Sequence, residues 1–237
     1  MKIEKCTDVS AIHTCGLIYA QPGSGKTTAL ALQPGRKLII DIDRSSVAIQ
    51  SQANQDKIAG LKENAGNIDI VKVGCNMRLF EETLAELEKG AYKDYDLICV
   101  DNLSELENQM LIEWGKTGKN DGAPEQRHYL LVQFKLVDYI NRFRSLDTNV
   151  IFTAWEDLRE VIDPSGEKYT KLVPLVARKH VDEICGKCNV VAHLETILDK
   201  DGNMKYYFRM AGDRTMSAKD QIYGRRTCKI NELIKVE

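Results

Sequence analysis

The sequence predicts an α/β domain in which a mostly parallel sheet lies between helices, followed by β-hairpins toward the C-terminus. Strand-like apolar runs alternate with helical patterns through the first two thirds of the 237 residues. A glycine-rich segment, Ala20–Thr27, joins one of these runs to a helix. Beyond Ala154, turn residues separate short alternating runs. Strands that alternate with helices form parallel sheets, because each helical crossover covers one face of the sheet.

Five apolar runs are the predicted strands of this sheet. They are Gly16–Ala20, Lys37–Asp41, Ile68–Val73, Leu97–Asp101 and Val150–Ala154. Two helices between them are indicated by helical spacing of apolar residues. The first carries Leu79, Phe80, Thr83, Leu84 and Leu87, and the second carries a stripe of Leu130, Phe134, Val137 and Ile140.

The C-terminal third predicts two β-hairpins. The first pairs Arg159–Ile162 with Lys168–Leu172 around Asp163-Pro164-Ser165-Gly166, and the second pairs Val190–Leu198 with Lys205–Met210 around Lys200-Asp201-Gly202-Asn203. We expect a single domain over residues 1–237, with a core of about residues 10–156 and a hairpin-rich part from about 157 to 237. The polar, glycine-rich segment Gly115–Ala123 is expected to be a mobile loop.

The glycine-rich segment is typical of a phosphate-binding loop. Its glycines let backbone N–H groups point inward at phosphate oxygens, and the helix that follows presents its positive N-terminal end. Lys26 supplies a charge for the β- and γ-phosphates, and Ala20 replaces the first glycine of the usual pattern. The alternative is a plain Gly/Pro turn, but the strand before it and the helix after it favour nucleotide binding. The predicted ATP-binding residues are Gln21, Pro22, Gly23, Ser24, Gly25, Lys26, Thr27 and Thr28.

Besides the phosphate loop, an acidic residue is needed to hold Mg²⁺. Asp101 is the candidate, because it ends the buried run Leu97–Asp101. Ligands of open α/β sheets bind outside the carboxyl ends of the strands, which places Asp101 beside the phosphate loop. Thr27 and Asp101 are therefore the predicted metal ligands. A cap for the helix that begins at Leu103 is the other interpretation of Asp101.

The residue that activates water is a separate question, because Asn102 and not glutamate follows Asp101. Asp43, just beyond the run Lys37–Asp41, is the candidate base, so the predicted catalytic residues are Lys26, Asp43 and Asp101. The alternative for Asp43 is a turn in which it pairs with Arg44, and Asp41 and Glu156 are the next candidates. Thr153 or Glu156 could sense the γ-phosphate, whereas Trp155 is at least as consistent with packing against the hairpin.

Composition limits the remaining classes. A formal net charge of −2 excludes a generally basic protein that coats nucleic acid. The first residues, Met1 to Cys6, contain no apolar signal core, and no apolar run approaches the length of a membrane span, so we expect a cytoplasmic protein without membrane contact. Seven scattered cysteines suit reduced thiols, although Cys185 and Cys188 could form half of a zinc site with His180, His193 or Cys228.

The chain resembles phage nucleotide-binding proteins with a RecA-like P-loop core, including the Sak-type single-strand annealing recombinases. The resemblance rests on the phosphate loop at Ala20–Thr27, on Ile40-Asp41-Ile42-Asp43 and on Val100-Asp101-Asn102. It extends to Ile151-Phe152-Thr153-Ala154 and to Ala218-Lys219-Asp220. It implies a RecA-like ATPase that uses ATP and Mg²⁺, binds single-stranded DNA and assists strand annealing or exchange. It also implies a homo-oligomer and, as a partner, a single-strand-binding protein of phage or host.

Single-stranded DNA is expected at two segments that follow strands ending at the nucleotide. Lys116 and Lys119 lie in the loop Gly115–Ala123, and the first hairpin contributes the cations Arg159, Lys168 and Lys171 and the aromatic Tyr169. In the alternative, this hairpin packs against a neighbouring subunit. The chain is then a nucleotide-controlled switch or assembly module in packaging or defence. A small-molecule kinase and a GTPase are disfavoured, because neither a second substrate pocket nor a guanine-reading motif is evident.

Overall fold

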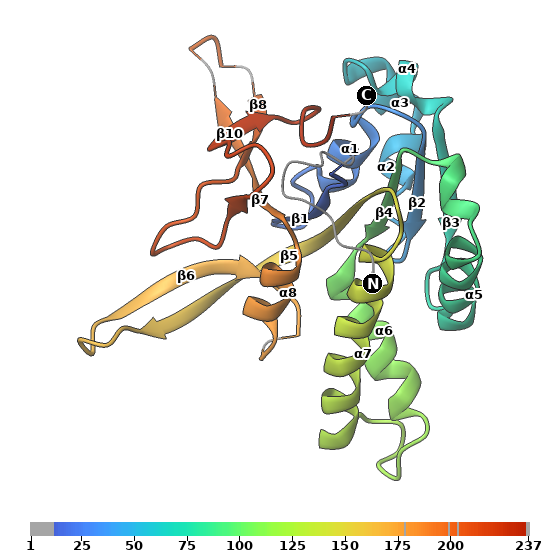
Figure 1. Cartoon of the computed structure of the whole chain (residues 1–237), viewed down its shortest axis with the longest axis vertical. Helices are drawn as coiled ribbons and strands as arrows, with labels where there is room; N and C mark the ends of the chain where they lie inside the picture. The colour runs from blue at the N-terminus through green and yellow to red at the C-terminus, as the bar shows by residue number, and fades with distance from the viewer. Residues whose placement is uncertain (1–11, 178, 199, 203, 236–237) are drawn as a thin grey trace, which may run out of the picture.

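A ten-stranded sheet with helices on both faces forms the body of the chain (Figure 1). The computed structural model describes residues 12–177, 179–198, 200–202 and 204–235, so the chain's first residues and position 203 of the second predicted turn lie outside the described part. The strands are β1 Cys15–Ala20, β2 Lys37–Asp41, β3 Ile68–Lys72, β4 Leu97–Asp101, β5 Asn149–Ile162, β6 Lys168–Pro174, β7 Val190–Leu198, β8 Met204–Arg209, β9 Lys219–Asp220 and β10 Thr227–Lys229. The helices are α1 Lys26–Ala31, α2 Val47–Gln50, α3 Gln52–Lys57, α4 Leu61–Ala65, α5 Met77–Glu88, the 3₁₀ turn η1 Ala91–Asp94, α6 Leu103–Gly115, α7 Gln126–Arg144 and α8 Val181–Lys187.

The order of the strands brings the predicted site residues to one edge of the sheet. The parallel strands lie in the order β3-β2-β4-β5-β1-β7, and β8 and β10 continue the sheet in antiparallel fashion. This mostly parallel sheet between helices confirms the predicted α/β class. The carboxyl ends of β1, β5, β4 and β2 are adjacent, so side chains just beyond these ends can meet.

Alternation along the strands divides the apolar core between two layers. In β1, Leu17 and Tyr19 point into the core that α5, α6 and α7 cover. Ile18 and Ala20 point to the opposite core, which contains residues of α1. Because both faces of the sheet are covered, the central strands β1 and β4 are buried throughout their length, and their residues are almost all apolar, as in other parallel sheets.

Helix α7 confirms the predicted helix but buries only part of the predicted apolar stripe, because Ile140 is buried and Val137 packs against the core. The residues that α7 buries are His128, Val132, Leu136, Tyr139, Ile140 and Phe143. Leu130 and Phe134 lie on the other side and are 54% and 60% exposed. The prediction was wrong there because two overlapping apolar stripes share this helix, and only one of them faces the sheet. No helix in the described residues is long and apolar enough to cross a membrane.

The first predicted hairpin is present and extends further than the sequence indicates. Strand β5 continues from the sheet without interruption through Ile162 and pairs with β6 from Glu156 opposite Pro174 to Ile162 opposite Lys168. In Figure 1 this hairpin projects away from the rest of the molecule. We call residues 156–174 the arm. Because β5 is one strand, the arm is directly connected to the sheet edge where the predicted site lies.

Candidate nucleotide-binding site

The predicted phosphate loop has the backbone that phosphate binding requires. It leaves β1 after Ala20 and enters α1 at Lys26. Gly23 and Gly25 have φ values of +77° and +94°, which residues with a side chain seldom adopt. The hydroxyl oxygen of Ser24 is buried without a partner among the described residues. Such a donor is expected to find an acceptor when a ligand binds, and a phosphate oxygen is a suitable one.

Lys26 is buried in this structure although it is the predicted phosphate ligand. The residue is 7% exposed, and its ammonium donates to the carbonyl oxygens of Ala20 at 2.9 Å and Gln21 at 2.8 Å. Burial lowers the pKa of Lys26, whereas the nearby carboxylates of Asp101 and Asp43 act in the opposite direction. The carbonyl oxygens of Ala20 and Gln21 therefore accept the hydrogen bonds that the Lys26 ammonium would donate to a bound phosphate.

Asp101 lies beneath the loop in contact with two hydroxyl groups. Thr27 and Ser45 both donate to its Oδ2, at 2.6 and 2.9 Å, and their hydroxyl oxygens lie 2.9 Å apart. Thr153, from the intervening strand β5, donates to the other carboxylate oxygen. Burial raises the pKa of Asp101, while the hydrogen bonds from Thr153, Thr27 and Ser45 lower it. The alternative role of Asp101 as a helix cap is wrong, because the side chain of Asn102 caps α6.

These three side chains fit a magnesium site. Mg²⁺ prefers oxygen ligands and usually takes only one or two carboxylates from the protein, with phosphate and water completing the shell. Thr27, Ser45 and Asp101 offer two hydroxyls and one carboxylate converging within hydrogen-bond distance. The sequence predicted Thr27 and Asp101 but not Ser45, which stands in a turn after β2 and carries no motif of its own.

Asp43 lies at the same cavity and is held in place by two hydrogen bonds. Its Oδ1 accepts the backbone N–H of Ser45 at 2.9 Å, and its Oδ2 accepts the side-chain amide of Asn102. The predicted alternative, an ion pair with Arg44, is not present among the described residues. Asn102 therefore links the turn after β2 to the end of β4. Its amide positions the carboxylate of Asp43, a role that the sequence did not indicate.

The loop, this turn and the start of α2 enclose a cavity of about 740 Å³. Every predicted catalytic residue lines it, together with Pro22, Gly23, Gly25, Thr27 and Thr28. Trp155 lines it as well, and its backbone N–H donates to the hydroxyl of Ser104 at 2.9 Å. A cavity with two acidic side chains, a buried lysine and a glycine-rich loop is suited to a nucleotide with its metal.

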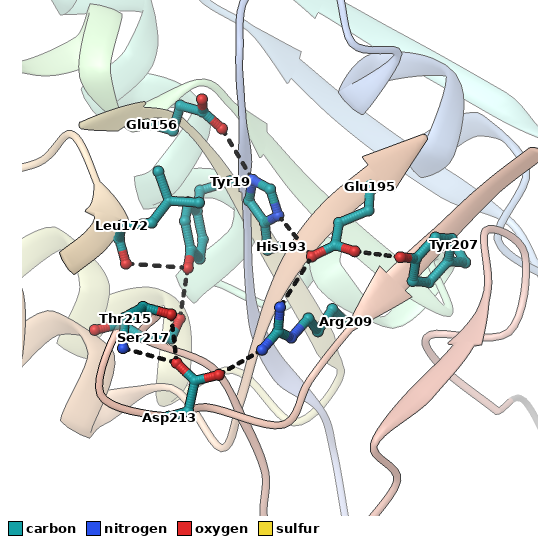
Figure 2. Close-up of polar contacts among 10 residues, drawn as sticks. All are labelled: Tyr19, Glu156, Leu172, His193, Glu195, Tyr207, Arg209, Asp213, Thr215 and Ser217. Carbon is teal, nitrogen blue, oxygen red and sulfur yellow. Dashed lines mark hydrogen bonds and ion pairs between the residues drawn. The ribbon is translucent and has the colours of Figure 1, made fainter. Parts of the chain in front are cut away.

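Glu156 does not join this cluster, because it is engaged by His193 (Figure 2). His193 Nε2 lies 2.9 Å from Glu156 Oε2, and His193 Nδ1 lies 3.5 Å from Glu195 Oε1. Glu195 in turn contacts Arg209 at 3.7 Å, and Arg209 donates to Asp213 at 2.5 Å. This line of charged groups starts at Glu156 of β5, next to Trp155 of the nucleotide cavity, and reaches Asp213 in the loop before β9.

The same loop is tied to the base of the arm. Asp213 accepts the backbone N–H and the hydroxyl of Thr215, both at 2.7 Å, and Leu172 of β6 donates its N–H to the Thr215 carbonyl at 2.7 Å. The hydroxyl of Tyr19 donates to the carbonyl of Ser217 at 2.8 Å, as Figure 2 shows. Strand β1, which carries the phosphate loop, thus contacts the segment that supports the arm.

The zinc alternative is not supported. Among the described residues, no three histidine, cysteine, aspartate or glutamate side chains are grouped so that they could hold a metal ion. Cys188 is buried and forms a hydrogen bond with the thiol of Cys15, and burial raises the pKa of Cys185 to about 12. These thiols are packed in the interior, as free cysteines in a reduced protein usually are.

The parallel sheet, the phosphate loop and the acidic end of β4 define a P-loop nucleotide-binding protein. A family model described as an AAA domain matches residues 13–222. The chain therefore belongs to this AAA domain family, a family of P-loop ATPases. A search of curated proteins found no match to the chain.

Replacing Asp101 by asparagine is expected to remove most of the Mg²⁺ dependence of ATP binding. The amide keeps the size of the side chain but loses the charge that would attract the metal. Calorimetric titration with ATP, in Mg²⁺ and in a chelator, measures the difference. Asp220, a buried carboxylate paired with Arg225 away from the cavity, gives the matched control, and Asp220→Asn should leave the Mg²⁺ effect intact. An undiminished Mg²⁺ effect in Asp101→Asn would place the metal elsewhere.

Proposed function

We propose that this chain binds and hydrolyses Mg²⁺-ATP and acts on single-stranded DNA in recombination or annealing. The observation that carries the nucleotide part is the cluster of Thr27, Ser45 and Asp101 beneath the phosphate loop. In addition, Asp43 is fixed at the same cavity by Asn102. ATP is the nucleotide we assign, because the family consists of P-loop ATPases.

Each group has a distinct role in this proposal. The N–H groups of the loop bind the phosphates, and Lys26 exchanges its two carbonyl partners for phosphate oxygens. Bound Mg²⁺ would neutralise the charge that develops on the phosphates. Asp43 accepts a hydrogen bond from water and orients it for attack, while the amide of Asn102 keeps the carboxylate in one rotamer. Thr153 connects Asp101 to β5, the strand that continues into the arm.

The DNA part of the proposal is supported by the resemblance to phage single-strand annealing proteins and by the connection of the arm to the site. Strand β5 passes the phosphate site and continues into the projecting arm. A change at the phosphates can therefore alter how the arm binds a ligand outside the core. The test is ATP turnover with and without single-stranded DNA, at fixed ionic strength. DNA-stimulated turnover supports the proposal, whereas turnover that ignores DNA favours the second candidate.

That second candidate is a nucleotide-controlled assembly module, and the surface of the arm favours it. Leu158 and Ile162 are 64% and 60% exposed and lie on the same face of β5. The cations of the arm are partly neutralised, because Lys168 lies 3.2 Å from Glu160 and Arg159 lies 3.5 Å from Asp182. An isolated two-stranded hairpin is marginally stable in water, so an apolar face on one suits contact with protein. A neighbouring copy of the chain is the partner we propose for it.

Two double variants of the arm separate the candidates. If lysines of the arm bind DNA phosphates, replacing Lys168 and Lys171 by alanine should flatten the salt dependence of DNA affinity by about one to two units of slope. Fluorescence anisotropy over a range of salt concentrations measures it. If the arm contacts another copy, replacing Leu158 and Ile162 by serine should lower the mass of the assembly instead. An unchanged salt slope in the lysine variant, with assembly lost in the serine variant, would show that the arm contacts another copy of the chain and does not bind DNA.

A further inference from the structure

Arg44 stands at the nucleotide cavity in a conformation that an arginine seldom adopts. Its φ is +63°, in the left-handed region that disfavours side chains with a Cβ. The hydrogen bond from the N–H of Ser45 to Asp43 spans this residue and holds the turn closed. A non-glycine residue in such a conformation persists where its surroundings fix it, and such residues concentrate at functional sites.

The guanidinium of Arg44 lies over Gly74, where the chain leaves space for it. A Cβ at Gly74 would lie 3.4 Å from Nε and 3.6 Å from Nη2 of Arg44, and Gly74 itself has a φ of +51°. In the described part of the chain, the guanidinium has no hydrogen bond or ion pair to a protein group. Arg44 therefore presents a planar set of N–H donors that remain available to an anion.

The position of Arg44 identifies which part of a nucleotide it can reach. Arg44 lines the 740 Å³ cavity that the phosphate loop also lines. In the sequence it follows Asp43 and precedes Ser45. Ser45 belongs to the oxygen cluster that would hold Mg²⁺, and in ATPases that metal would neutralise charge on the terminal phosphates. The backbone of Arg44 is accordingly next to a residue of the proposed metal cluster. Among the described residues that line the cavity, Lys26 is the other cation.

We propose that Arg44 binds the terminal phosphate of ATP, from the turn after β2, while Lys26 binds the phosphates from the loop. This inference rests on the proposed function, because it assumes that ATP occupies the cavity. A guanidinium matches phosphate oxygens in a bidentate geometry and carries its charge at every accessible pH. Arg44 thereby distinguishes ATP from ADP, and it stabilises the charge of the phosphate that departs.

The test compares the affinities for ATP and ADP in variants of Arg44. Arg44→Gly removes the guanidinium and tolerates the positive φ, so it is expected to fold at least as well as the parent. We expect its ATP affinity to fall about 10-fold or more and its turnover about 10²-fold, the range for one lost transition-state donor. ADP affinity should change less than about twofold. Arg44→Lys keeps a charge without the fork and should fall between Arg44→Gly and the parent.

Controls separate this inference from the proposed function. Arg226 is an exposed arginine outside the nucleotide cavity, and Arg226→Ala should bind both nucleotides like the parent. If the parent binds no nucleotide, the proposed function fails. If the parent binds ATP and Lys26→Ala does not, while Arg44→Gly binds and hydrolyses ATP like the parent, only the role of Arg44 is refuted. Equal weakening of ATP and ADP in Arg44→Gly would also refute it, because the contact would then not involve the terminal phosphate.

Discussion

Replacing Lys26 by alanine is expected to lower the affinity for Mg²⁺-ATP by roughly 10²-fold, because a hydrogen bond to a charged group contributes about 1.5–3 kcal/mol. Turnover should fall at least as much, since the same charge faces the phosphate that is transferred. Lys26 is buried and donates to two backbone carbonyls, so the change also removes contacts in the protein without ligand. Calorimetric titration of the folded variant, with thermal unfolding measured in parallel, checks both effects.

The chain offers a matched control for this substitution. Lys37 is likewise buried, and its ammonium donates to the carbonyls of Gln33 and Gly35, both at 2.7 Å. It begins β2, at the opposite end of that strand from the turn with Asp43. Lys37→Ala should lower the thermal stability and leave ATP affinity unchanged. If Lys26→Ala bound ATP as tightly as the parent, the loop would not be the phosphate site.

Replacing Asp43 by asparagine is expected to preserve ATP binding and to lower hydrolysis by roughly 10²-fold or more, the effect of losing a positioned general base. Asparagine retains a side-chain oxygen that can accept the N–H of Ser45, so the turn should remain formed. Phosphate release under single-turnover conditions measures the chemical step. The ATP dissociation constant of the same variant is its internal control.

Two outcomes would contradict this role. Parental hydrolysis by Asp43→Asn would mean that the base is elsewhere, and Asp41, whose buried Oδ1 has no partner among the described residues, would be the next candidate. A loss of ATP affinity equal to the loss of turnover would mean that Asp43 holds the nucleotide or its metal and does not activate water. Asp43→Glu is expected to keep measurable turnover, because it retains the carboxylate.

The sequence predicted the fold and part of the site, because both depend on local patterns. Alternating apolar and helical segments gave the parallel sheet, and β2 and β4 begin and end where the apolar runs do. The phosphate loop and Asp101 were identifiable because their chemistry requires particular residues directly after particular strands. The structure brings Lys26, Asp43 and Asp101 to one cavity, as the order of the strands requires.

The residues that sequence reasoning missed act through contacts between distant segments. Ser45 joins the metal cluster only because β2 lies beside β4, and Asn102 holds Asp43 across the same pair of strands. The burial of Lys26 depends on carbonyls that close around its ammonium. On α7 the outward placement of Phe134 depended on which of two apolar stripes met the sheet. None of these features has a signature in a single segment of sequence.

The most direct test of the central claim is the rate of phosphate release from ATP by the purified chain in Mg²⁺, with an identically prepared Lys26→Ala variant as the blank for contaminating ATPases. The account predicts turnover by the parent that disappears with a chelator and falls by at least roughly 10²-fold in the variant. Equal rates from parent and variant would contradict hydrolysis at this site. If the parent binds Mg²⁺-ATP yet releases no phosphate above the blank, the chain is a nucleotide-binding switch and the proposal that it hydrolyses ATP is wrong.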